Sequence, residues 1–276
     1  MILQDEIERL LALPAAEARA AGMAVVAEFR AGLNRGEFRS AEKSAEGWKT
    51  NLWVKRGILL AFRIGAIVDR SVPGEFVFFD KDTLPTHSFQ TTDGVRVVPG
   101  GSSIRDGAYI AANVICMPPM FINIGAYVDE GTMVDSHALV GSCAQIGKRV
   151  HLSAAAQIGG VLEPPNALPV IVEDEAFIGG NCGIYEGVLV ESRAVLAPGV
   201  ILTGGTAVYD LVRGEVYRRT AERPLTIPRG AVVVPGSRPA TGEFAIKHGV
   251  SLYAPVIVKY RDSKTDASTM LEQALR

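Results

Sequence analysis

The chain has 276 residues, a formal net charge of −2, 29 glycines and three cysteines, and 48% of its residues are hydrophobic. This length allows a sizeable core in one large or two modest domains, and the near-neutral charge argues against a general nucleic-acid-binding surface. The first ten residues are acidic where a signal peptide would be basic, and no long uncharged apolar stretch follows, so we expect a cytoplasmic protein without a membrane anchor.

The first part of the chain carries helical patterns. In residues 1–33, apolar side chains recur at helical spacing, and Pro14 divides the pattern into two helices. Residues 47–64 predict a third helix, for which Gly65 is a plausible stop. We expect this part of the chain to cover the first coil of the repeat that follows it, because bare strand edges invite aggregation.

The middle of the chain repeats with a period of six residues. From Val98 to Ile158, and again from Val172 to Val208, every sixth residue is Ile, Leu or Val, with Cys116 as the one exception. Neither a helix, with its period of 3.6, nor an ordinary strand, with its period of 2, keeps such a phase over about a hundred residues. The residue four places after each of these anchors is nearly always small or β-branched. The repeat predicts a mainly β fold, a solenoid in which three six-residue sides make one coil of parallel strands.

Two interruptions and a tail complete the pattern. Three prolines predict a loop ejected near 159–171, and the repeat breaks again over 209–226, where Arg213-Gly214-Glu215 has the character of a hairpin tip. Beyond the solenoid, we expect a strand at 251–260 and a short helix at 270–275. The predicted domains are a mostly α-helical N-terminal domain (1–95), a parallel β-helix (96–237) and a small C-terminal strand and helix extension (238–276).

Four segments carry longer and more specific motifs. They are AEKSAEGWKTNLWVKRGILLAFRI (41–64), VRVVPGGSSIRDGAYIA (95–111), MPPMFINIGAYVDEGTMVDSHALVGSCAQIGKRVHLSAAAQIGGVLEP (117–164) and YAPVIVKY (253–260). These segments resemble the tetrahydrodipicolinate N-succinyltransferase family of hexapeptide-repeat acyltransferases. The resemblance implies a left-handed parallel β-helix and a homotrimer with its sites between subunits. It also implies transfer of a succinyl group from succinyl-CoA, a co-substrate, to the amine of ring-opened tetrahydrodipicolinate, in the diaminopimelate route to lysine, with no tightly bound cofactor and no metal.

The resemblance also assigns residues to the acceptor substrate. Arg96 matches the family's substrate-binding arginine, and a guanidinium can bind one carboxylate of a dicarboxylic substrate in bidentate fashion. The alternative for Arg96 is a solvated arginine before the first coil. Asp135 matches the substrate-binding and catalytic aspartate, and the attacking amine needs a base to take its proton. The alternative for Asp135 is a corner aspartate that closes a turn, as Asp129 would do. Further cleft-lining candidates are His151, Ser153 and Gly160, with a merely solvated side chain as the alternative for the histidine.

The chain departs from the family pattern in the stretch FIGGNCGIYEG. Many members have a glutamate there as a second acid/base candidate, and the aligned position in this chain is Gly183. Glu186, three residues later, aligns with a separate family glutamate and is the remaining catalytic candidate. This departure leaves the identity of the acyl donor open.

Coenzyme A carries phosphates that need cations. Basic residues along the solenoid are therefore candidates to bind it, although each could also be an ordinary solvated side chain. These candidates are Lys148, Arg149, Arg213, Arg218 and Arg219.

Three other functions are alternatives to this one, and the sequence supports them unequally. A related acyltransferase could use acetyl-CoA or another amine acceptor. A zinc-dependent carbonic anhydrase on a β-helix needs three histidines, whereas only His137 and His151 lie in the repeat, and their spacing of fourteen does not match the eighteen-residue coil. A non-enzymatic solenoid would show ranks of exposed threonine or a strongly charged face, which are missing. The sequence therefore favours acyl transfer between small molecules.

Overall fold

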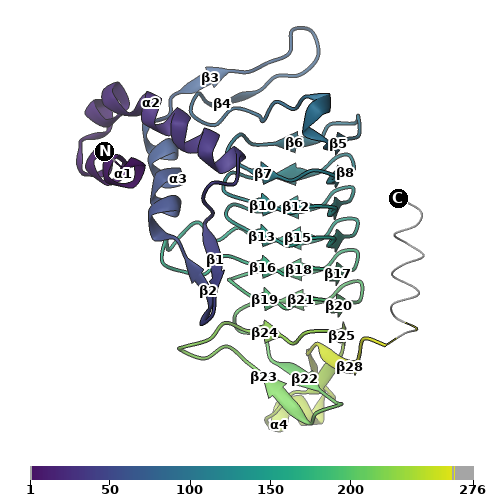
Figure 1. Cartoon of the computed structure of the whole chain (residues 1–276). Helices are drawn as coiled ribbons and strands as arrows, with labels where there is room; N and C mark the ends of the chain where they lie inside the picture. Colours follow the sequence, from purple (N-terminus) through teal and green to yellow (C-terminus); the bar gives the residue numbers. More distant parts are fainter. Residues whose placement is uncertain (1, 263, 265–276) are drawn as a thin grey trace.

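The computed structural model describes residues 2–262 and 264. A cluster of helices lies beside a long prism of short stacked strands, and a group of longer strands closes the far end of the prism (Figure 1). The helices are α1 (Leu3–Ala12), α2 (Ala15–Asn34), α3 (Leu52–Ile64), the 3₁₀ turn η1 (Thr91–Asp93) and α4 (Glu243–Lys247).

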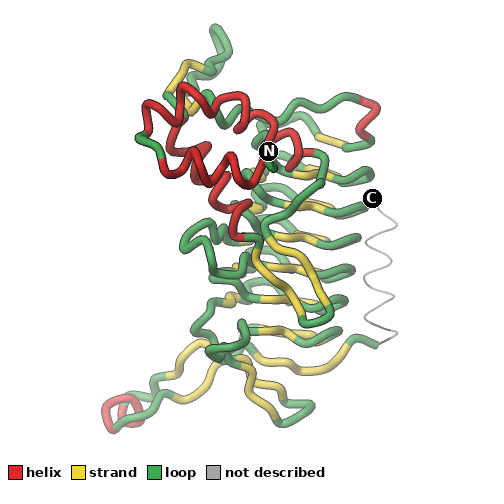
Figure 2. The backbone as a smooth tube through the Cα atoms, turned by 60° about the vertical axis from the view of Figure 1, so that its left-hand side comes forward, coloured by secondary structure: helices red, strands yellow, loops and turns green. Residues whose placement is uncertain are grey.

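The N-terminal helices follow the sequence pattern with one correction. Pro14 separates α1 from α2, and Gly65 caps the C-terminus of α3, as predicted. The predicted helix over 47–64 is wrong at its start, because residues 47–50 form strand β2 (Gly47–Thr50), which pairs with β1 (Ala41–Ser44). The indole nitrogen of Trp48 in β2 donates a hydrogen bond to Glu173 of the prism at 2.9 Å. This contact holds the hairpin along the strands, and the helix begins only after it (Figure 2).

Three faces of parallel strands make up the prism, and the chain visits them in the order A, B, C. Face A contains β7 (Tyr109–Ile110), β10 (Tyr127–Val128), β13 (Gln145–Ile146), β16 (Ile171–Val172), β19 (Leu189–Val190) and β24 (Thr226–Ile227). Face B contains β5 (Arg96–Val97), β8 (Ile115–Cys116), β11 (Met133–Val134), β14 (His151–Leu152), β17 (Phe177–Ile178), β20 (Val195–Leu196) and β25 (Ala231–Val234). Face C contains β6 (Ser103–Ile104), β9 (Phe121–Ile122), β12 (Leu139–Val140), β15 (Gln157–Ile158), β18 (Gly183–Ile184) and β21 (Ile201–Leu202).

The six-residue period is the spacing of inward side chains. In the two-residue strands from β6 to β21, the second residue is an anchor of the repeat and points into the core, as Ile122, Val128 and Val134 do with no exposed area. Successive coils pair at a spacing of eighteen residues, for example Tyr127 with Gln145. The first anchor, Val98, is wrong by one residue: β5 pairs Val97 with Cys116, and Val98 is half-buried, because β5 is the end strand of its sheet.

The corners of the prism require an unusual backbone. Among the residues that the structure describes, nine non-glycine residues have positive φ, and each lies in a turn between two faces. A side chain in this region costs of order 1 kcal/mol, which the stacking of neighbouring coils must offset. The residues are Asn113, His137, Cys143, Arg149, Ala155, Glu175, Asn181, Glu186 and Arg193.

Both predicted interruptions of the repeat are present. Gln145 pairs with Ile171, 26 residues later instead of 18, because the chain between β15 and β16 carries a loop. Val161 and Val170, near the two ends of this segment, still pack into the prism core. The second interruption contains the hairpin of β22 (Val208–Asp210) and β23 (Glu215–Tyr217).

The strand predicted over 251–260 is two strands, β27 (Ser251–Tyr253) and β28 (Val256–Tyr260), because Pro255 has no N–H to continue a ladder. β27 pairs with β26 (Ser237–Pro239), and β28 lies between β25 and β22 in the face-B sheet. The helix predicted at 270–275 lies outside the described residues.

The helical part packs against the corner between faces C and A. Ile124 and Cys143, both from that corner, belong to the same core as Ile7, Phe29 and Ile58 of the helices. Along face A, the guanidinium of Arg39 lies 3.6 Å from the centre of the Tyr127 ring. The helices therefore fix one corner of the prism, while face B lies on the other side of it (Figure 1).

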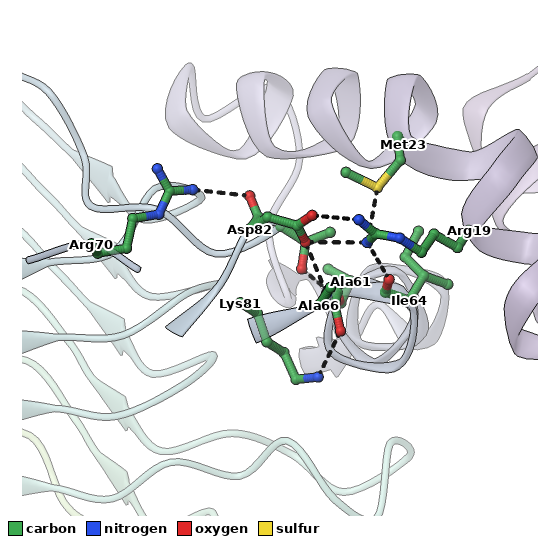
Figure 3. Close-up of polar contacts among 10 residues, drawn as sticks. Arg19, Met23, Ala61, Ile64, Ala66, Arg70, Lys81 and Asp82 are labelled. Carbon is green, nitrogen blue, oxygen red and sulfur yellow. Dashed lines mark hydrogen bonds and ion pairs between the residues drawn. The ribbon is translucent and has the colours of Figure 1, made fainter. Parts of the chain in front are cut away.

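A hairpin of β3 (Ile67–Asp69) and β4 (Phe79–Lys81) joins the helices to the first coil. Just after β4, Asp82 accepts hydrogen bonds from the guanidinium of Arg19 in α2, at 2.6 and 3.2 Å, and from the backbone N–H of Ala66 (Figure 3). Residues 85–87 then run beside β6, where His87 donates its N–H to Ile104. This part of the chain thus covers an edge of the first coil, as expected.

The three cysteines, Cys116, Cys143 and Cys182, are free and buried. Burial raises the pKa of Cys116 and of Cys143 to about 12. No helix among the described residues is long and apolar enough to cross a membrane.

Candidate functional site

The predicted acceptor residues share face B. Arg96 begins β5, Asp135 follows β11, and both His151 and Ser153 come from the coil after it. Strands β5 and β11 are two steps apart in the sheet, so Arg96 and Asp135 lie about 10 Å apart along the prism axis. Arg96 is exposed, and its guanidinium is therefore available to a ligand on this face.

Asp135 and the corner aspartate Asp129 have different surroundings. One oxygen of each carboxylate accepts the N–H of the next residue, at 2.7 Å for Asp135 and 2.8 Å for Asp129. The other oxygen of Asp135 lies 4.0 Å from the Nε2 atom of His151. The turn-closing role thus applies to both residues, and only Asp135 also faces an imidazole.

His151 is not a solvated surface histidine. Its side chain is 6% exposed, and its ring meets Phe177 of the next coil edge-on, with centroids 4.8 Å apart. The ring is therefore held in place beside the carboxylate of Asp135.

A second group of candidates lies at the opposite edge of face C. Gly160 and Glu186 line a cleft of about 960 Å³, here named the loop pocket, between the ejected loop and residues 219–224. Its lining comprises Gly159, Gly160, Val161, Glu163, Pro164, Asn166, Ala167, Leu168, Tyr185, Glu186, Gly187, Thr203, Arg219, Thr220, Ala221, Glu222, Arg223 and Pro224. Gly160 is necessary here, because a Cβ on it would lie 2.7 Å from the backbone nitrogen of Ser142 in the preceding coil.

The ejected loop is held by a buried lysine that the sequence did not reveal as important. Lys55 of α3 has no exposed area, and its ammonium donates hydrogen bonds to the carbonyls of Val161 and Ala167, the latter at 2.6 Å. Burial lowers the pKa of Lys55. One side chain of the helical part therefore fixes a wall of the loop pocket.

Glu186 and Arg219 meet at one side of this pocket. Oε2 of Glu186 accepts the N–H of Gly204 at 3.0 Å. A Cβ on Gly204 would lie 3.0 Å from that oxygen and 3.2 Å from Nη1 of Arg219, so both charged groups border the same glycine. This side of the pocket thus presents an anionic and a cationic side chain, and Glu163, Glu222 and Arg223 line the rest of the cleft.

Gly183, where the family pattern has a glutamate, is covered by an aromatic ring. A Cβ on Gly183 would lie 2.5 Å from Cε2 of Tyr185 and 2.9 Å from its hydroxyl oxygen. Tyr185 also lines the loop pocket. The sequence did not single out Tyr185. The one signal was a large side chain with a hydroxyl group two places after Gly183, which occupies an outward position of the repeat.

Three of the five basic candidates for CoA line a pocket. Arg219 lines the loop pocket, whereas Arg213 and Arg218 line a neighbouring cleft of about 730 Å³, the hairpin pocket, next to β23. The two pockets share Leu168, Thr220, Glu222, Arg223 and Pro224.

Lys148 and Arg149 are not near either pocket. They lie at the corner between faces A and B, where Lys148 is 3.8 Å from Glu130 and Arg149 is 2.8 Å from Glu175. Hydrogen bonding to Glu175 raises the pKa of Arg149.

The two groups of predicted residues do not meet within one chain. Asp135 lies where face B turns into face C, and Glu186 lies where face C turns into face A, two strand steps further along. The width of a face and this axial offset together separate them by roughly 15–20 Å. Within the described residues, we find no group of three or more His, Cys, Asp or Glu side chains that could hold a metal ion.

Comparisons with known proteins bear on the family and the fold of the chain. Residues 3–64 match the family model "Tetrahydrodipicolinate N-succinyltransferase N-terminal", and residues 169–204 match "Hexapeptide repeat of succinyl-transferase". A crystal structure from Campylobacter jejuni, described as a 2,3,4,5-tetrahydropyridine-2-carboxylate N-succinyltransferase, superimposes with a TM-score of 0.51 at 16% identity. That match covers 83% of this chain and 61% of the Campylobacter chain, and it supports the fold alone.

Curated relatives are much closer in sequence. A 2,3,4,5-tetrahydropyridine-2,6-dicarboxylate N-succinyltransferase from Polynucleobacter asymbioticus is 45% identical over 251 residues, which cover 89% of this chain and 86% of the relative. Proteins of the same name from Sodalis glossinidius and Acinetobacter baylyi are each 43% identical over 282 residues, covering 99% and 100% of this chain and 96% and 97% of theirs. The chain therefore belongs to the tetrahydrodipicolinate N-succinyltransferase family.

Proposed function

We propose that this protein transfers a succinyl group from succinyl-CoA to the amine of ring-opened tetrahydrodipicolinate, the reaction of the diaminopimelate route to lysine. The observation that carries this proposal is identity of 43–45% to relatives named for this activity, in two cases over nearly the whole chain. The exposed arginine and the carboxylate on face B suit an acceptor that has two carboxylates and an amine.

The chemistry requires a base and a place for the thioester. The amine nitrogen attacks the thioester carbonyl carbon, the C–N bond forms, and the C–S bond breaks. In this proposal Asp135 takes the proton that the amine loses, and the departing thiolate receives that proton as CoA thiol. Arg96 binds one carboxylate of the acceptor. His151 and Ser153 line the same face, and Gly160 leaves room for substrate in the loop pocket.

The active site is complete only between copies. We propose a homotrimer of left-handed β-helices, in which the Asp135 edge of one copy faces the loop pocket of its neighbour. Support comes from the distance between these two edges within one chain, which no single acceptor molecule spans together with a thioester. The proposal also includes the division into an N-terminal domain (1–95), a β-helix (96–237) and a C-terminal extension (238–276).

We assign the CoA phosphates to the basic side chains of the loop and hairpin pockets. Arg213, Arg218 and Arg219 line two clefts that share one wall, which suits a long and narrow ligand. We assign Lys148 and Arg149 a smaller share in binding the CoA phosphates, because acidic side chains already face them.

A donor comparison tests the proposed function. Purified protein is given tetrahydrodipicolinate with either succinyl-CoA or acetyl-CoA, and free thiol is measured over time. We expect much faster thiol release with succinyl-CoA. A preference for acetyl-CoA would replace the proposed acyl group, and no acceptor-dependent thiol release with either donor would reject the function.

A further inference from the structure

Tyr185 is held over a seat of two glycines. The ring of Tyr185 lies where a side chain on Gly183 would begin. Gly159 follows β15, the strand that pairs with β18, and a Cβ on it would lie 2.7 Å from Cδ1 of Tyr185. Glycines in two successive coils thus remove the side chains that would push the ring away from face C. Such a seat fixes the direction of the ring and with it the position of the hydroxyl group.

The hydroxyl group is available to a ligand. Tyr185 is half-buried and lines the loop pocket next to Gly160 and Glu186. Its hydroxyl makes no hydrogen bond with any part of the chain that the structure describes, whereas other tyrosine hydroxyls are engaged, such as that of Tyr260 with Asp210 at 2.6 Å. A donor that is fixed in place, borders a cleft and has no protein partner is suited to bind substrate.

We propose that Tyr185 is a catalytic residue whose hydroxyl donates a hydrogen bond to the thioester carbonyl oxygen as the amine attacks; this rests on the proposed function. The carbonyl oxygen gains negative charge when the C–N bond forms and loses it when the C–S bond breaks. Tyr185 keeps its proton throughout, so the step needs no other reagent. In this pocket the carboxylate of Glu186 would repel this charge, and Arg219 is assigned to the CoA phosphates. A neutral fixed donor such as the Tyr185 hydroxyl stabilises the charge where it develops.

Removal of the hydroxyl alone tests this role. Tyr185→Phe keeps the ring on its seat, and we expect kcat to fall about 100-fold, as for the loss of one oxyanion donor, with little change in KM for either substrate. Tyr109→Phe is the matched control, because that ring stacks on Tyr127 at face A, 4.4 Å between centroids and away from both pockets, and its kcat should stay at the wild-type value.

A second variant moves the hydroxyl without removing it. Gly183→Ala places a methyl group against the Tyr185 ring and should lower kcat in the wild-type background. In the Tyr185→Phe background the same change should have almost no further effect on kcat, because the hydroxyl it displaces is already gone.

The results separate the two proposals. If the wild-type protein shows acceptor-dependent thiol release with succinyl-CoA and Tyr185→Phe keeps full kcat, the catalytic role is wrong and the proposed function stands. A rise in KM for one substrate with unchanged kcat also overturns the role, as does an equal effect of Gly183→Ala in both backgrounds. If the wild-type protein itself has no activity, the proposed function fails.

Discussion

Nε2 of His151 lies 4.0 Å from Oδ2 of Asp135, in adjacent coils of the same face. The imidazole is almost fully buried and packed edge-on against Phe177, so it offers the carboxylate a fixed neighbour. The side chain of Asp135 is 30% exposed, so the carboxylate can be reached from outside. The pair thus has the geometry that the proposed base requires: a fixed neighbour on one side and an exposed approach on the other.

Asp135→Asn should abolish most turnover. The amide cannot accept the proton of the attacking amine, and the loss of a general base costs about 10²–10⁴-fold in kcat. The local bond to the N–H of Ser136 can be kept by the amide oxygen, so folding and assembly should be unchanged. Thiol release and sedimentation measure these two properties.

Asp129→Asn is the matched control for this change. Asp129 makes the same bond to its following residue but has no histidine partner. Equal activity in wild-type protein and Asp129→Asn is expected. An Asp135→Asn protein that turns over at the wild-type rate would remove this carboxylate from the mechanism.

Arg96→Lys should raise KM for the acceptor by about tenfold or more. Lysine keeps the charge but loses the planar pair of donors that binds a carboxylate. The effect on KM for succinyl-CoA should be small, because the donor is assigned to other residues. Arg238→Lys, at a site far along the chain in β26, serves as control. Unchanged acceptor KM in Arg96→Lys would contradict the assignment.

Lys55→Met should loosen the wall of the loop pocket. The carbonyl of Val161 loses the lysine donor, whereas that of Ala167 keeps the hydroxyl of Thr50 at 3.3 Å. An unsatisfied buried carbonyl costs about 1–3 kcal/mol. We expect a lower free energy of unfolding and faster hydrogen exchange in residues 161–168. Exchange at wild-type rates in this loop would show that the lysine does not hold it.

The same lysine should give stability a pH dependence. Burial lowers its pKa in the folded protein, so between that pKa and the value near 10.4 of unfolded lysine the unfolded chain binds more protons. The free energy of unfolding therefore gains from this group as the pH rises through that window. Urea titrations at several alkaline pH values should show this gain in wild-type protein and not in Lys55→Met.

Asp82 should contribute to stability above mildly acidic pH. The hydrogen bond from Arg19 lowers the pKa of Asp82 to about 2, below its ordinary value (Figure 3). A carboxylate with a lowered folded pKa stabilises fully above the unfolded pKa of about 3.9, and this contribution disappears as the pH falls through the folded value. Asp82→Asn should melt a few degrees lower at pH 7, by a modest amount because Arg19 is partly exposed to solvent.

Acidification gives the internal control for this variant. The difference in Tm between wild-type protein and Asp82→Asn should shrink as the pH approaches 2. A difference that stays constant over this range would mean that the ion pair is not its source.

The solenoid was predictable because its signal is local and repeated. Each anchor position is predicted again by the anchor six residues away. The error at Val98, where the first strand is one residue out of register, therefore leaves the other predicted anchors unchanged. The start of α3 was not predictable in this way. Residues 47–50 have a helical pattern, and only the pairing with 41–44 and the contact of Trp48 with Glu173 make them a strand.

The residues of the candidate site also fall into those that the sequence predicts and those that it does not. Arg96 and Asp135 stand in motifs that the sequence shows directly, and their common face follows from the coil length. The positions of Tyr185 and Lys55 could not be read from the sequence. One depends on two glycines that become neighbours only when coils stack, and the other on a loop more than a hundred residues away.

Mixed assemblies test the central claim most directly. Asp135→Asn protein is co-expressed with a variant that carries Tyr185→Ala and Glu186→Ala, so that each lacks one side of the site. If the site lies between copies, random trimers of two inactive parents should recover about a quarter of the wild-type sites. Mixed trimers no more active than their parents would contradict a site shared between subunits.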